Sequence, residues 1–273
     1  MHVCFILPSL SIGGAEKVIL QLMNNISCKV SLILLERDGL LEGHLSSSVS
    51  VYGLNKKNIR SALFTIIKLI PKIRPDLLFT TSAHISVSIL LIKFLLPKNI
   101  KFIIRESNMP SVNLRNSKKA LILKYLYKWS YKYANAIVCP GSSIKNDLNA
   151  IVKLKDKTFS IIPNPVNTKG IRKQLKTNIY IEKNNGCYHL LAAGSFTPQK
   201  GFDMLIEAMA DLVKRIEHVR LTILGDGKEK DRIIESINRY NLWNHIQLKG
   251  YKRDVFPYFA SSDLFVLTSR WEG

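Results

Sequence analysis

The chain has 273 residues, 47% of them hydrophobic, so it is long and apolar enough to bury two globular cores, which excludes a disordered chain. Its four cysteines show no CxxC pair and no metal-ligand spacing, which favours small buried thiols in a reduced, cytosolic compartment over a metal module. The net charge of +20 is uneven, because residues 1–166 hold 23 Lys/Arg and 8 Asp/Glu (net +15) and residues 167–273 hold 17 and 12 (net +5).

A basic first half favours an anionic partner: a membrane surface, a lipid phosphate or a nucleic acid. A lysine-rich genome would explain the excess equally well. The longest apolar stretch, Ile85 to Leu96, has 12 residues and contains Lys93, so it is too short to span a bilayer. Met1 leads directly into an apolar run without a basic leader, and no signal peptide is expected. These features predict a cytoplasmic protein, peripheral on the inner face of the cytoplasmic membrane if its partner is lipid.

The first half alternates short apolar runs with amphipathic stretches. The continuous apolar run His2–Leu7 predicts a strand buried on both faces, and apolar residues spaced by three and four from Ala15 to Ile26 predict a helix with one core face. Pro71 and Pro75 are expected to bracket the end of the next helix. The same patterns predict strands at 30–35, 49–52, 76–80, 100–104 and 135–139, and helices at 57–70, 84–96 and 117–133.

A second series of strands and helices begins after a break. Pro163-Asn-Pro165 cannot continue a strand or a helix, and the stretch 167–186 is polar and lysine-rich. Two such series predict an α/β protein with two Rossmann-like domains whose parallel sheets face a cleft: residues 1–166, a linker 167–186, and residues 187–273. The second series consists of strands 187–193, 219–224, 245–248 and 264–267, and helices 201–215, 228–240 and 253–260.

Glycine-rich segments follow several of these strands, at the carboxyl ends where open α/β sheets bind ligands. In Gly194-Ser-Phe-Thr-Pro-Gln-Lys-Gly201, Lys200 lies at the mouth of a helix, where a lysine beside helix-terminal amides is suited to a diphosphate. Gly225-Asp226-Gly227 and Gly13-Gly14 permit close backbone approach to a ligand, although a tight structural turn is an equal explanation for each. The P-loop pattern GxxxxGK[ST] and the dinucleotide pattern GxGxxG are both absent.

Three polar side chains follow strands of the first domain. Arg105 and Asn108 come directly after strand 100–104, and the planar donor fork of Arg105 suits an acceptor phosphate. His84 follows strand 76–80, and on the sequence alone a structural histidine at a helix start is the more common case. Arg105 is therefore the candidate for contact with an acceptor phosphate.

The expected helix 117–133 carries Lys124, Lys128 and Lys132 at four-residue spacing, flanked by Tyr127 and Tyr131. Residues 107–146 contain no acidic residue. Lysines bordered by tyrosines suit an anionic lipid interface, and an ordinary solvated lysine face is the alternative. The other apolar residues of this helix are expected to face a core: Ile122, Tyr125, Leu126, Trp129 and Tyr133.

The run Asp263–Gly273 is a buried strand followed by a polar turn that carries Glu272, which alone would be an ordinary solvated glutamate. Together with GGAE at 13–16, GSFTPQKG at 194–201 and GDG at 225–227, in this order and spacing, it resembles glycosyltransferase family 4. These are retaining nucleotide-sugar transferases of the two-domain GT-B fold. The resemblance covers nearly the whole chain.

The resemblance implies that Glu272, a catalytic and donor-binding residue, opens an E-x7-E carboxylate pair whose second member lies beyond Gly273. A C-terminal domain incomplete by roughly 70–100 residues is therefore expected. It also implies that His84 approaches the reacting sugar and that Tyr251 borders the nucleotide base. The implied acceptor side contains Gly13 and Gly14, and we expect Arg105 and Asn108 there too. Ser195 is a departure, because the family commonly has an arginine there. The implied donor site is Gly194, Ser195, Lys200, Gly225, Asp226, Gly227, Tyr251 and Glu272.

The implied activity is transfer of a hexose or N-acetylhexosamine, with retention, from a UDP- or GDP-linked sugar to a lipid-linked or polysaccharide acceptor in bacterial cell-surface glycan synthesis. No DxD sequence occurs, so a metal-free diphosphate site without further cofactor is expected. The alternative is a truncated transferase that has lost turnover and keeps only partial ligand binding. Nucleic-acid binding is disfavoured, because the basic helix accompanies no recognised binding motif.

Overall fold

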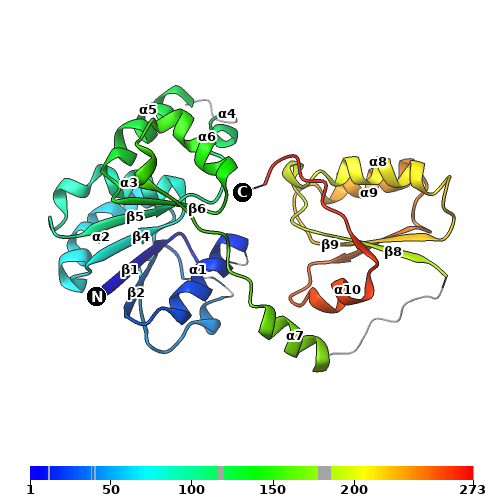
Figure 1. Ribbon diagram of the computed structural model, residues 1–273, viewed down its shortest axis with the longest axis horizontal. Helices are drawn as coiled ribbons and strands as arrows, with labels where there is room; N and C mark the ends of the chain where they lie inside the picture. The colour runs from blue at the N-terminus through cyan, green and yellow to red at the C-terminus, as the bar shows by residue number, and fades with distance from the viewer. Residues whose placement is uncertain (12, 38, 40, 116–119, 178–185, 273) are drawn as a thin grey trace. The chain divides into compact units, whose positions relative to one another are not determined.

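The computed structural model describes residues 1–11, 13–37, 39, 41–115, 120–177 and 186–272. By its internal contacts the chain divides into two compact units, Met1–Pro165 and Val166–Glu272. The division falls within one residue of the expected end of the first domain at 166. Each unit contains its own parallel sheet with helices on both faces (Figure 1).

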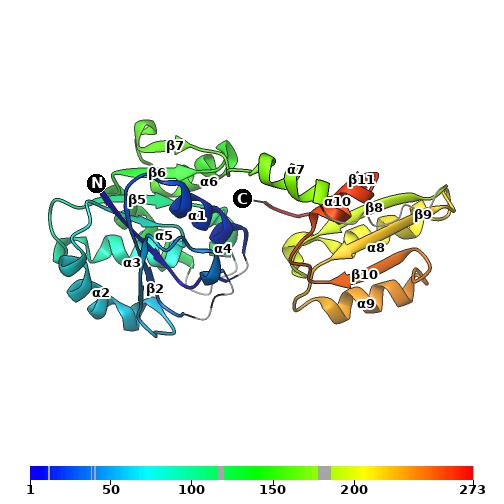
Figure 2. The ribbon, with the colours of Figure 1, turned by 90° about the horizontal axis from the view of Figure 1, so that it is seen from below.

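The first unit is built on a seven-stranded sheet in the order β3-β2-β1-β4-β5-β6-β7, and every pairing in it is parallel. Figure 2 shows β7 at the outer edge beside β6. The strands are β1 (His2–Leu7), β2 (Lys29–Leu34), β3 (Val49–Gly53), β4 (Leu77–Thr80), β5 (Lys101–Arg105), β6 (Ala136–Cys139) and β7 (Phe159–Ile161). The helices are α1 (Gly14–Asn25), α2 (Ile59–Ile73), α3 (Ala83–Leu91), α4 (Pro110–Arg115), α5 (Ala120–Ser130) and α6 (Ser142–Val152), with short 3₁₀ turns η1 (Glu42–His44), η2 (Lys93–Leu95), η3 (Tyr131–Tyr133) and η4 (Asp156–Thr158).

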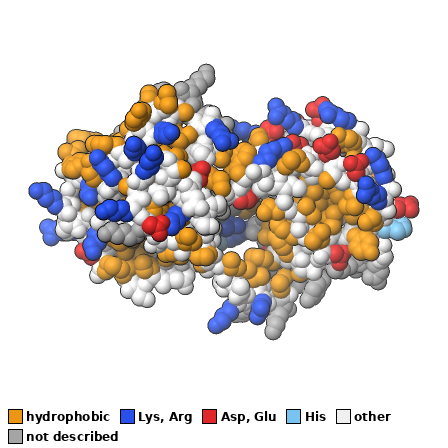
Figure 3. All heavy atoms as spheres, turned by 45° about the horizontal axis from the view of Figure 1, so that its top comes forward, with side chains coloured by type: hydrophobic (Ala, Val, Ile, Leu, Met, Phe, Trp, Pro, Cys, Tyr) orange, Lys and Arg blue, Asp and Glu red, His pale blue; other side chains and the backbone are white. Residues whose placement is uncertain are grey.

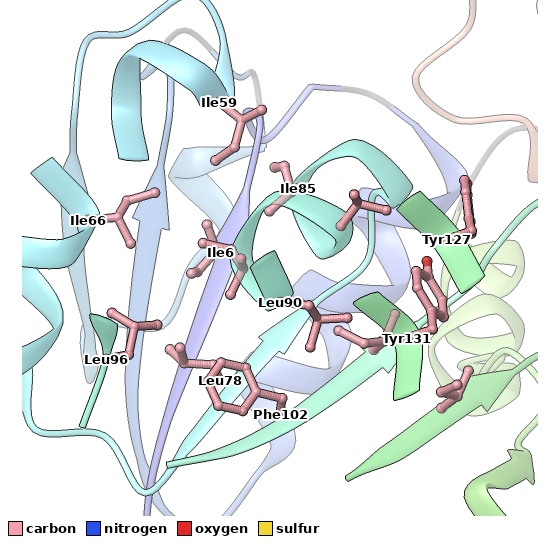
Figure 4. Packing of buried hydrophobic residues seen from close by; sticks show 14 of the residues in the cluster. Ile6, Ile59, Ile66, Leu78, Ile85, Leu90, Leu96, Phe102, Tyr127 and Tyr131 are labelled. Carbon is pink, nitrogen blue, oxygen red and sulfur yellow. The ribbon is translucent and has the colours of Figure 1, made fainter. Parts of the chain in front are cut away.

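Successive residues of β1 point into two different cores, as the pleat of a strand requires. Cys4 and Ile6 face a cluster that α2, α3, α5 and α6 cover, and Figure 4 shows part of this cluster, including Tyr127 and Tyr131. Val3, Phe5 and Leu7 face the other core, which α1 closes with Ile19 and Met23. Burial on both faces explains why β1 reads as an uninterrupted apolar run.

The second unit has a four-stranded parallel sheet in the order β10-β9-β8-β11. Helices α8 and α9 cover one face and α10 covers the other (Figure 1). The strands are β8 (Tyr188–Ala193), β9 (Val219–Leu224), β10 (Ile246–Gly250) and β11 (Leu264–Phe265). The helices are α7 (Thr168–Thr177), α8 (Phe202–Leu212), α9 (Lys230–Arg239) and α10 (Phe256–Ser261), with the 3₁₀ turn η5 (Pro198–Lys200) before α8.

Several sequence-based boundaries are wrong. Helix α2 continues through Pro71 to Ile73: proline disfavours a helix interior, but burial of Ile70 and Ile73 on either side of it favours continuation. The expected helix 117–133 is shorter: α5 begins at Ala120, 117–119 lie outside the described residues, and residues 131–133 form the 3₁₀ turn η3. The expected linker contains α7, which contacts α10, while 178–185 lie outside the described residues. Elements α4, α6 and β7 were not predicted.

Strand β11 forms one edge of the second sheet and leaves apolar surface open. Leu264 and Leu267 are 58% and 57% exposed. An apolar groove of about 400 Å³ lies beside them, lined by β8, β11 and the side of α8 that carries Leu205, Met209 and Leu212. Among the helices that the structure describes, none is long and apolar enough to cross a membrane.

The cysteines differ in burial. Cys4 and Cys139 lie fully buried in the larger core of the first unit, where loss of solvation raises the thiol pKa to about 12 and about 11. Cys28 and Cys187 are partly exposed, one in each unit.

A buried hydrogen bond fastens α5 and η3 to the carboxyl end of β5. The Tyr131 hydroxyl donates to Oε2 of Glu106 over 2.6 Å, and the backbone N–H of Glu106 donates to the carbonyl of Val138 over 2.9 Å. Burial raises the pKa of Glu106 from 4.5 to about 7, against the opposing effects of Tyr131 and Arg105. Between about pH 4.5 and about pH 7 the folded chain therefore retains a proton on Glu106 that the unfolded chain releases.

This raised pKa predicts a pH-dependent stability. The contribution of Glu106 is fully present below about pH 4.5 and is lost as the pH rises to about 7, a total on the order of 3 kcal/mol. Glu106→Gln keeps the size and the neutral state of the side chain, so the variant should lack this loss and gain on the parent as the pH rises. Urea unfolding of both proteins between about pH 4.5 and about pH 8 measures the difference.

Glu235→Gln is the matched control, because Glu235 is exposed on α9, where it forms an ion pair with Arg239. Its unfolding curve should run parallel to that of the parent. A Glu106→Gln curve that also runs parallel to the parent would contradict the prediction.

Candidate functional site

Three loops meet at the carboxyl edge of the second sheet, and backbone hydrogen bonds hold them together. The N–H of Gly194 donates to the carbonyl of Leu224 over 2.9 Å, and the N–H of Phe196 donates to that of Asp226 over 2.8 Å. The N–H of Gly225 donates to the carbonyl of Gly250 over 2.9 Å. The segments after β8, β9 and β10 therefore form one continuous floor.

Two glycines in this floor are required by its geometry. Gly225 and Gly227 have φ values of +148° and +151°, which residues with a side chain rarely adopt. A Cβ on Gly225 would overlap the carbonyl oxygen of Gly194, and one on Gly227 would lie 2.6 Å from the carbonyl oxygen of Phe196. The GDG sequence therefore does more than turn the chain: it lets two loops touch through their backbones.

Lys200 and Glu272 form an ion pair at this edge, with 2.6 Å between Nζ and Oε1. The Lys200 side chain is 21% exposed and that of Glu272 is 42% exposed, so the pair lies at the surface of the floor and solvent can reach it. Partial burial pushes the pKa of Glu272 upward, but the hydrogen bonds from Lys200 and Ser269 and the charge of Lys200 together outweigh it, and the net pKa is lowered. Glu272 is therefore ionised at neutral pH.

The aliphatic stem of Lys200 lies against Gly194, whose absent side chain leaves room for it. A Cβ at Gly194 would lie 3.2 Å from two carbons of that stem. The Lys200 ammonium has three donors, and the structure shows one of them bonded to a side chain, that of Glu272. An anionic group placed on the glycine floor would meet a cation already fixed in position.

The loop that carries Glu272 is fastened to the lysine loop by residues that the sequence reasoning missed. Arg270 forms a two-point ion pair with Asp203 at 2.9 and 2.5 Å and donates to the carbonyl of Pro198 over 2.8 Å. The Gln199 amide donates to the carbonyl of Trp271, and the Thr268 hydroxyl donates to that of Lys200. Arg270 directly precedes the Trp-Glu pair in sequence, but nothing in the sequence indicates that its partner lies 67 residues earlier.

The remaining expected donor residues lie on the same loops. Asp226 is exposed, and its Oδ1 accepts the N–H of Gly227 over 2.8 Å. Ser195 is exposed beside Gly194, and Tyr251 is 50% exposed after β10. The structure thus places all eight expected donor residues on the carboxyl side of one sheet.

In the first unit, Gly13 and Gly14 lie where α1 begins. Gly13 is the extended N-cap residue, and the Glu16 carboxylate lies directly against it, where a Cβ would clash. This carboxylate lies close to the amides at the helix start and is therefore placed to interact favourably with them. An acceptor approaching this loop would meet Glu16 as well as backbone donors.

His84 lies in the first turn of α3 and lines a pocket of about 370 Å³ in the first unit. Pro8, Ser9, Glu36, Lys57 and Arg60 contribute to the same pocket. The ring is exposed, yet its partial burial lowers its pKa below the ordinary value. A neutral imidazole at pH 7 follows, able to accept or donate one hydrogen bond.

Arg105 is 5% exposed, and its guanidinium donates hydrogen bonds to other side chains of the protein. It donates to the Thr81 hydroxyl over 3.0 Å and to the Asn164 side-chain oxygen over 2.7 Å. Burial lowers its pKa, which Glu106 and Glu16 oppose. Asn108 is exposed on the same loop. Arg105 thus joins the ends of β4 and β5 to the Pro163–Pro165 segment, and its contact with an acceptor stays a prediction.

The expected division of the lysine helix into two faces is wrong for its aromatic residues. Tyr127 and Tyr131 are 5% and 0% exposed and stack on each other within the core, so neither can lie at a membrane surface. Ile122, Tyr125 and Trp129, expected in the core, are 60%, 73% and 45% exposed. Lys124, Lys128 and Lys132 are exposed as expected. The buried hydrogen bond from Tyr131 to Glu106 accompanies this orientation, and the sequence pattern does not indicate that pairing.

Two family models match the chain in succession. The model described as Glycosyltransferase Family 4 matches residues 12–169, and that described as Glycosyl transferases group 1 matches residues 179–273. The matched segments correspond to the two compact units.

The chain is also similar to individual proteins. It is 30% identical over 224 residues to an uncharacterised glycosyltransferase of Methanocaldococcus jannaschii, which covers 77% of this chain and 54% of that protein. It is 26% identical over 174 residues to the N-acetylgalactosamine-N,N'-diacetylbacillosaminyl-diphospho-undecaprenol 4-alpha-N-acetylgalactosaminyltransferase of Campylobacter jejuni, covering 63% of this chain and 46% of that enzyme. The chain therefore spans about half the length of these relatives.

Among solved structures, the crystal structure of the Anabaena protein HepE in complex with UDP and glucose aligns with a TM-score of 0.74 at 19% identity. The alignment covers 98% of this chain and 74% of that one, so the two share a fold. The Family 4 match alone extends over 158 of the 273 residues, from 12 to 169. On these grounds the chain belongs to glycosyltransferase family 4, with an α/β fold of the GT-B kind.

Proposed function

We propose that this protein transfers a hexose or N-acetylhexosamine, with retention, from a UDP- or GDP-linked sugar to a lipid-linked or polysaccharide acceptor in bacterial cell-surface glycan synthesis. The single observation behind the proposal is the Lys200–Glu272 pair, which lies on a floor of glycine loops at the carboxyl edge of a parallel sheet. Such an edge is where open α/β sheets bind nucleotides.

In this proposal the diphosphate of the donor lies over Gly194 and Gly225, and Lys200 contacts its oxygens. As the bond from the anomeric carbon to the diphosphate breaks, negative charge accumulates on the departing phosphate, where a fixed ammonium stabilises it most. The acceptor hydroxyl oxygen forms the new bond, and its proton passes to the departing phosphate. The UDP bound to the structurally similar HepE supports a nucleotide diphosphate as the ligand class.

Glu272 is proposed to accept hydrogen bonds from hydroxyl groups of the transferred sugar. Its lowered pKa keeps it ionised, and an ionised carboxylate is a pure acceptor that suits sugar hydroxyls. The Arg270–Asp203 pair would then act through position, since it fixes the loop on which Glu272 lies. An error of about 1 Å in that loop would cost catalysis heavily.

On the first unit, we propose that His84 approaches the reacting sugar and that Gly13, Gly14 and Asn108 contact the acceptor. The neutral state of His84 suits a hydrogen bond to a sugar hydroxyl better than an ion pair. The name of the Campylobacter jejuni relative contains an undecaprenol-linked diphosphate acceptor, which supports a lipid-linked acceptor here. Such an acceptor would place the protein on the inner face of the cytoplasmic membrane.

Replacing Lys200 tests the proposal most directly. Lys200→Ala removes the fixed cation, so kcat/KM for the nucleotide sugar should fall by roughly 10²–10³-fold. UDP binding, measured by calorimetry on the 273-residue chain, should weaken by roughly tenfold or more. Transfer is assayed with several nucleotide sugars and a membrane-lipid extract.

Lys214→Ala is the matched control, because Lys214 is an exposed lysine of the same unit whose partner is Asp211. It should leave both quantities unchanged. An effect of Lys200→Ala below about threefold on UDP binding would remove Lys200 from the site. Binding of UDP without turnover would leave the inactive-transferase alternative standing.

Glu272→Gln separates the sugar from the nucleotide. The variant loses a charged acceptor, so kcat/KM should fall by roughly 10–100-fold, the cost of one hydrogen bond to a charged group. UDP alone should bind within about threefold of the parent, because Lys200 remains. Calorimetry with UDP beside steady-state kinetics measures the two effects, and an equal loss of UDP affinity would place Glu272 at the diphosphate instead.

A further inference from the structure

We propose that an exposed surface formed by η2 and α5 inserts into an anionic bilayer at the boundary between its headgroups and its acyl chains. This surface, the aromatic–lysine surface, consists of Phe94, Leu95, Leu121, Ile122, Tyr125 and Trp129 with Lys124, Lys128 and, from the adjoining η3, Lys132. The proposal rests on the proposed function only for its purpose, delivery of a lipid-linked acceptor. Its physical basis is separate.

The apolar side chains of this surface are largely exposed to water, which is unfavourable for apolar groups. Phe94 and Leu95 are 67% and 65% exposed, and Leu121 and Tyr125 are 74% and 73% exposed. Single exposed apolar residues are ordinary, but a gathering of six is typical of a binding surface. Figure 3 shows hydrophobic and basic side chains mixed over the part of the first unit where α5 lies.

Ring contacts join the two segments into one surface. Tyr133 packs edge-on against Phe94 of η2, with ring centroids 5.1 Å apart, and edge-on against Trp129 of α5 at 5.5 Å. Lys93 donates to the carbonyl of Tyr133 over 3.2 Å, which fixes η2 beside η3. The aromatic edge is therefore preassembled, although 27 residues separate Lys93 from Ala120 at the start of α5.

The charge of the surface selects an anionic partner. Within the described part of the chain, none of Lys124, Lys128 and Lys132 has an acidic partner, and no acidic residue occurs between 107 and 146. The Lys132 ammonium lies over the rings of Trp129 and Tyr133, at 5.5 and 5.0 Å from their centroids. A lysine can extend its apolar stem along such rings while its charge reaches lipid phosphate.

A bilayer fits this combination better than a protein partner does. Tryptophan and tyrosine favour the boundary between hydrocarbon and water, and lysines interspersed among apolar residues match a surface that is apolar below and anionic above. The helix is held from behind by Tyr127 and Tyr131, so binding requires no folding step. The surface can therefore enter the interface as a rigid edge.

The first experiment measures sedimentation of the 273-residue chain with vesicles of phosphatidylcholine alone and of equimolar phosphatidylcholine and phosphatidylglycerol. We expect binding to the anionic vesicles and little to the neutral ones. The variant Lys124→Gln/Lys128→Gln/Lys132→Gln should bind roughly a hundredfold more weakly. The variant Phe94→Ser/Ile122→Ser/Trp129→Ser should lose binding to a similar degree with its charge intact, and an unchanged melting curve checks its folding.

The matched control removes the same charge elsewhere in the first unit: Lys29→Gln/Lys72→Gln/Lys101→Gln. These lysines are exposed; Lys29 and Lys101 begin β2 and β5, and Lys72 lies in the last turn of α2. It should bind anionic vesicles within about threefold of the parent. If the control variant weakens vesicle binding as much as the Lys124/Lys128/Lys132 variant does, net charge alone explains the effect, and the proposed role of this surface is overturned.

The second experiment tests insertion. With Trp243→Phe and Trp271→Phe, Trp129 is the only tryptophan in the sequence, and vesicles with brominated acyl chains should quench its fluorescence. The counterpart Trp129→Phe, which keeps Trp243 and Trp271, should show no quenching. Binding without quenching of Trp129 would overturn insertion.

A third result would identify a protein interface instead and overturn the proposal. In it the parent binds no vesicles and is oligomeric, whereas the Phe94→Ser/Ile122→Ser/Trp129→Ser variant is monomeric. Vesicle binding is measured without any assay of sugar transfer, so it tests this inference separately from the proposed function. If the parent does not bind vesicles but Lys200→Ala weakens UDP binding and transfer as expected, only this inference is overturned. If the parent binds vesicles as expected but Lys200→Ala changes neither UDP binding nor transfer, only the proposed function is overturned.

Discussion

Parallel strands bring their carboxyl ends to one edge, and this constraint underlies the candidate donor site. The loops after β8, β9 and β10 share that edge, and their backbones touch because Gly225 and Gly227 have no side chains. Only when these loops are in register does the stem of Lys200 pack on Gly194 and its ammonium reach Glu272, 72 residues later. The site is thus a property of the sheet topology, and the side chains refine it.

Much of this arrangement could be predicted from the sequence, because its signals are local. A double-sided apolar run predicted β1 to the residue, and glycines directly after strands predicted which loops carry Lys200 and Asp226. The Family 4 and group 1 matches confirm the family that the motifs indicated. Local signals succeed here because strand ends and helix starts are fixed by neighbours in sequence.

The rest depended on partners distant in sequence. Periodicity alone placed Tyr127 and Tyr131 on the exposed face of the helix, whereas both are buried. The hydrogen bond that holds Tyr131 in the core is made to Glu106, 25 residues earlier in the chain. Pro71 lies inside α2, where burial of isoleucines on both sides favours a helix interior that proline disfavours. The support of Glu272 by Arg270 and Asp203 is invisible in sequence for the same reason, since neither residue occurs in a recognisable pattern.

The distribution of the thiols has a practical consequence for measuring how this protein moves. Cys4 and Cys139 are shielded and have raised pKa values, so thiol-directed reagents react with them slowly. Cys28 and Cys187 are partly exposed, and one lies in each compact unit. Without any engineering, a pair of spin labels or fluorophores on these two cysteines would act as a ruler between the units, readable with and without nucleotide.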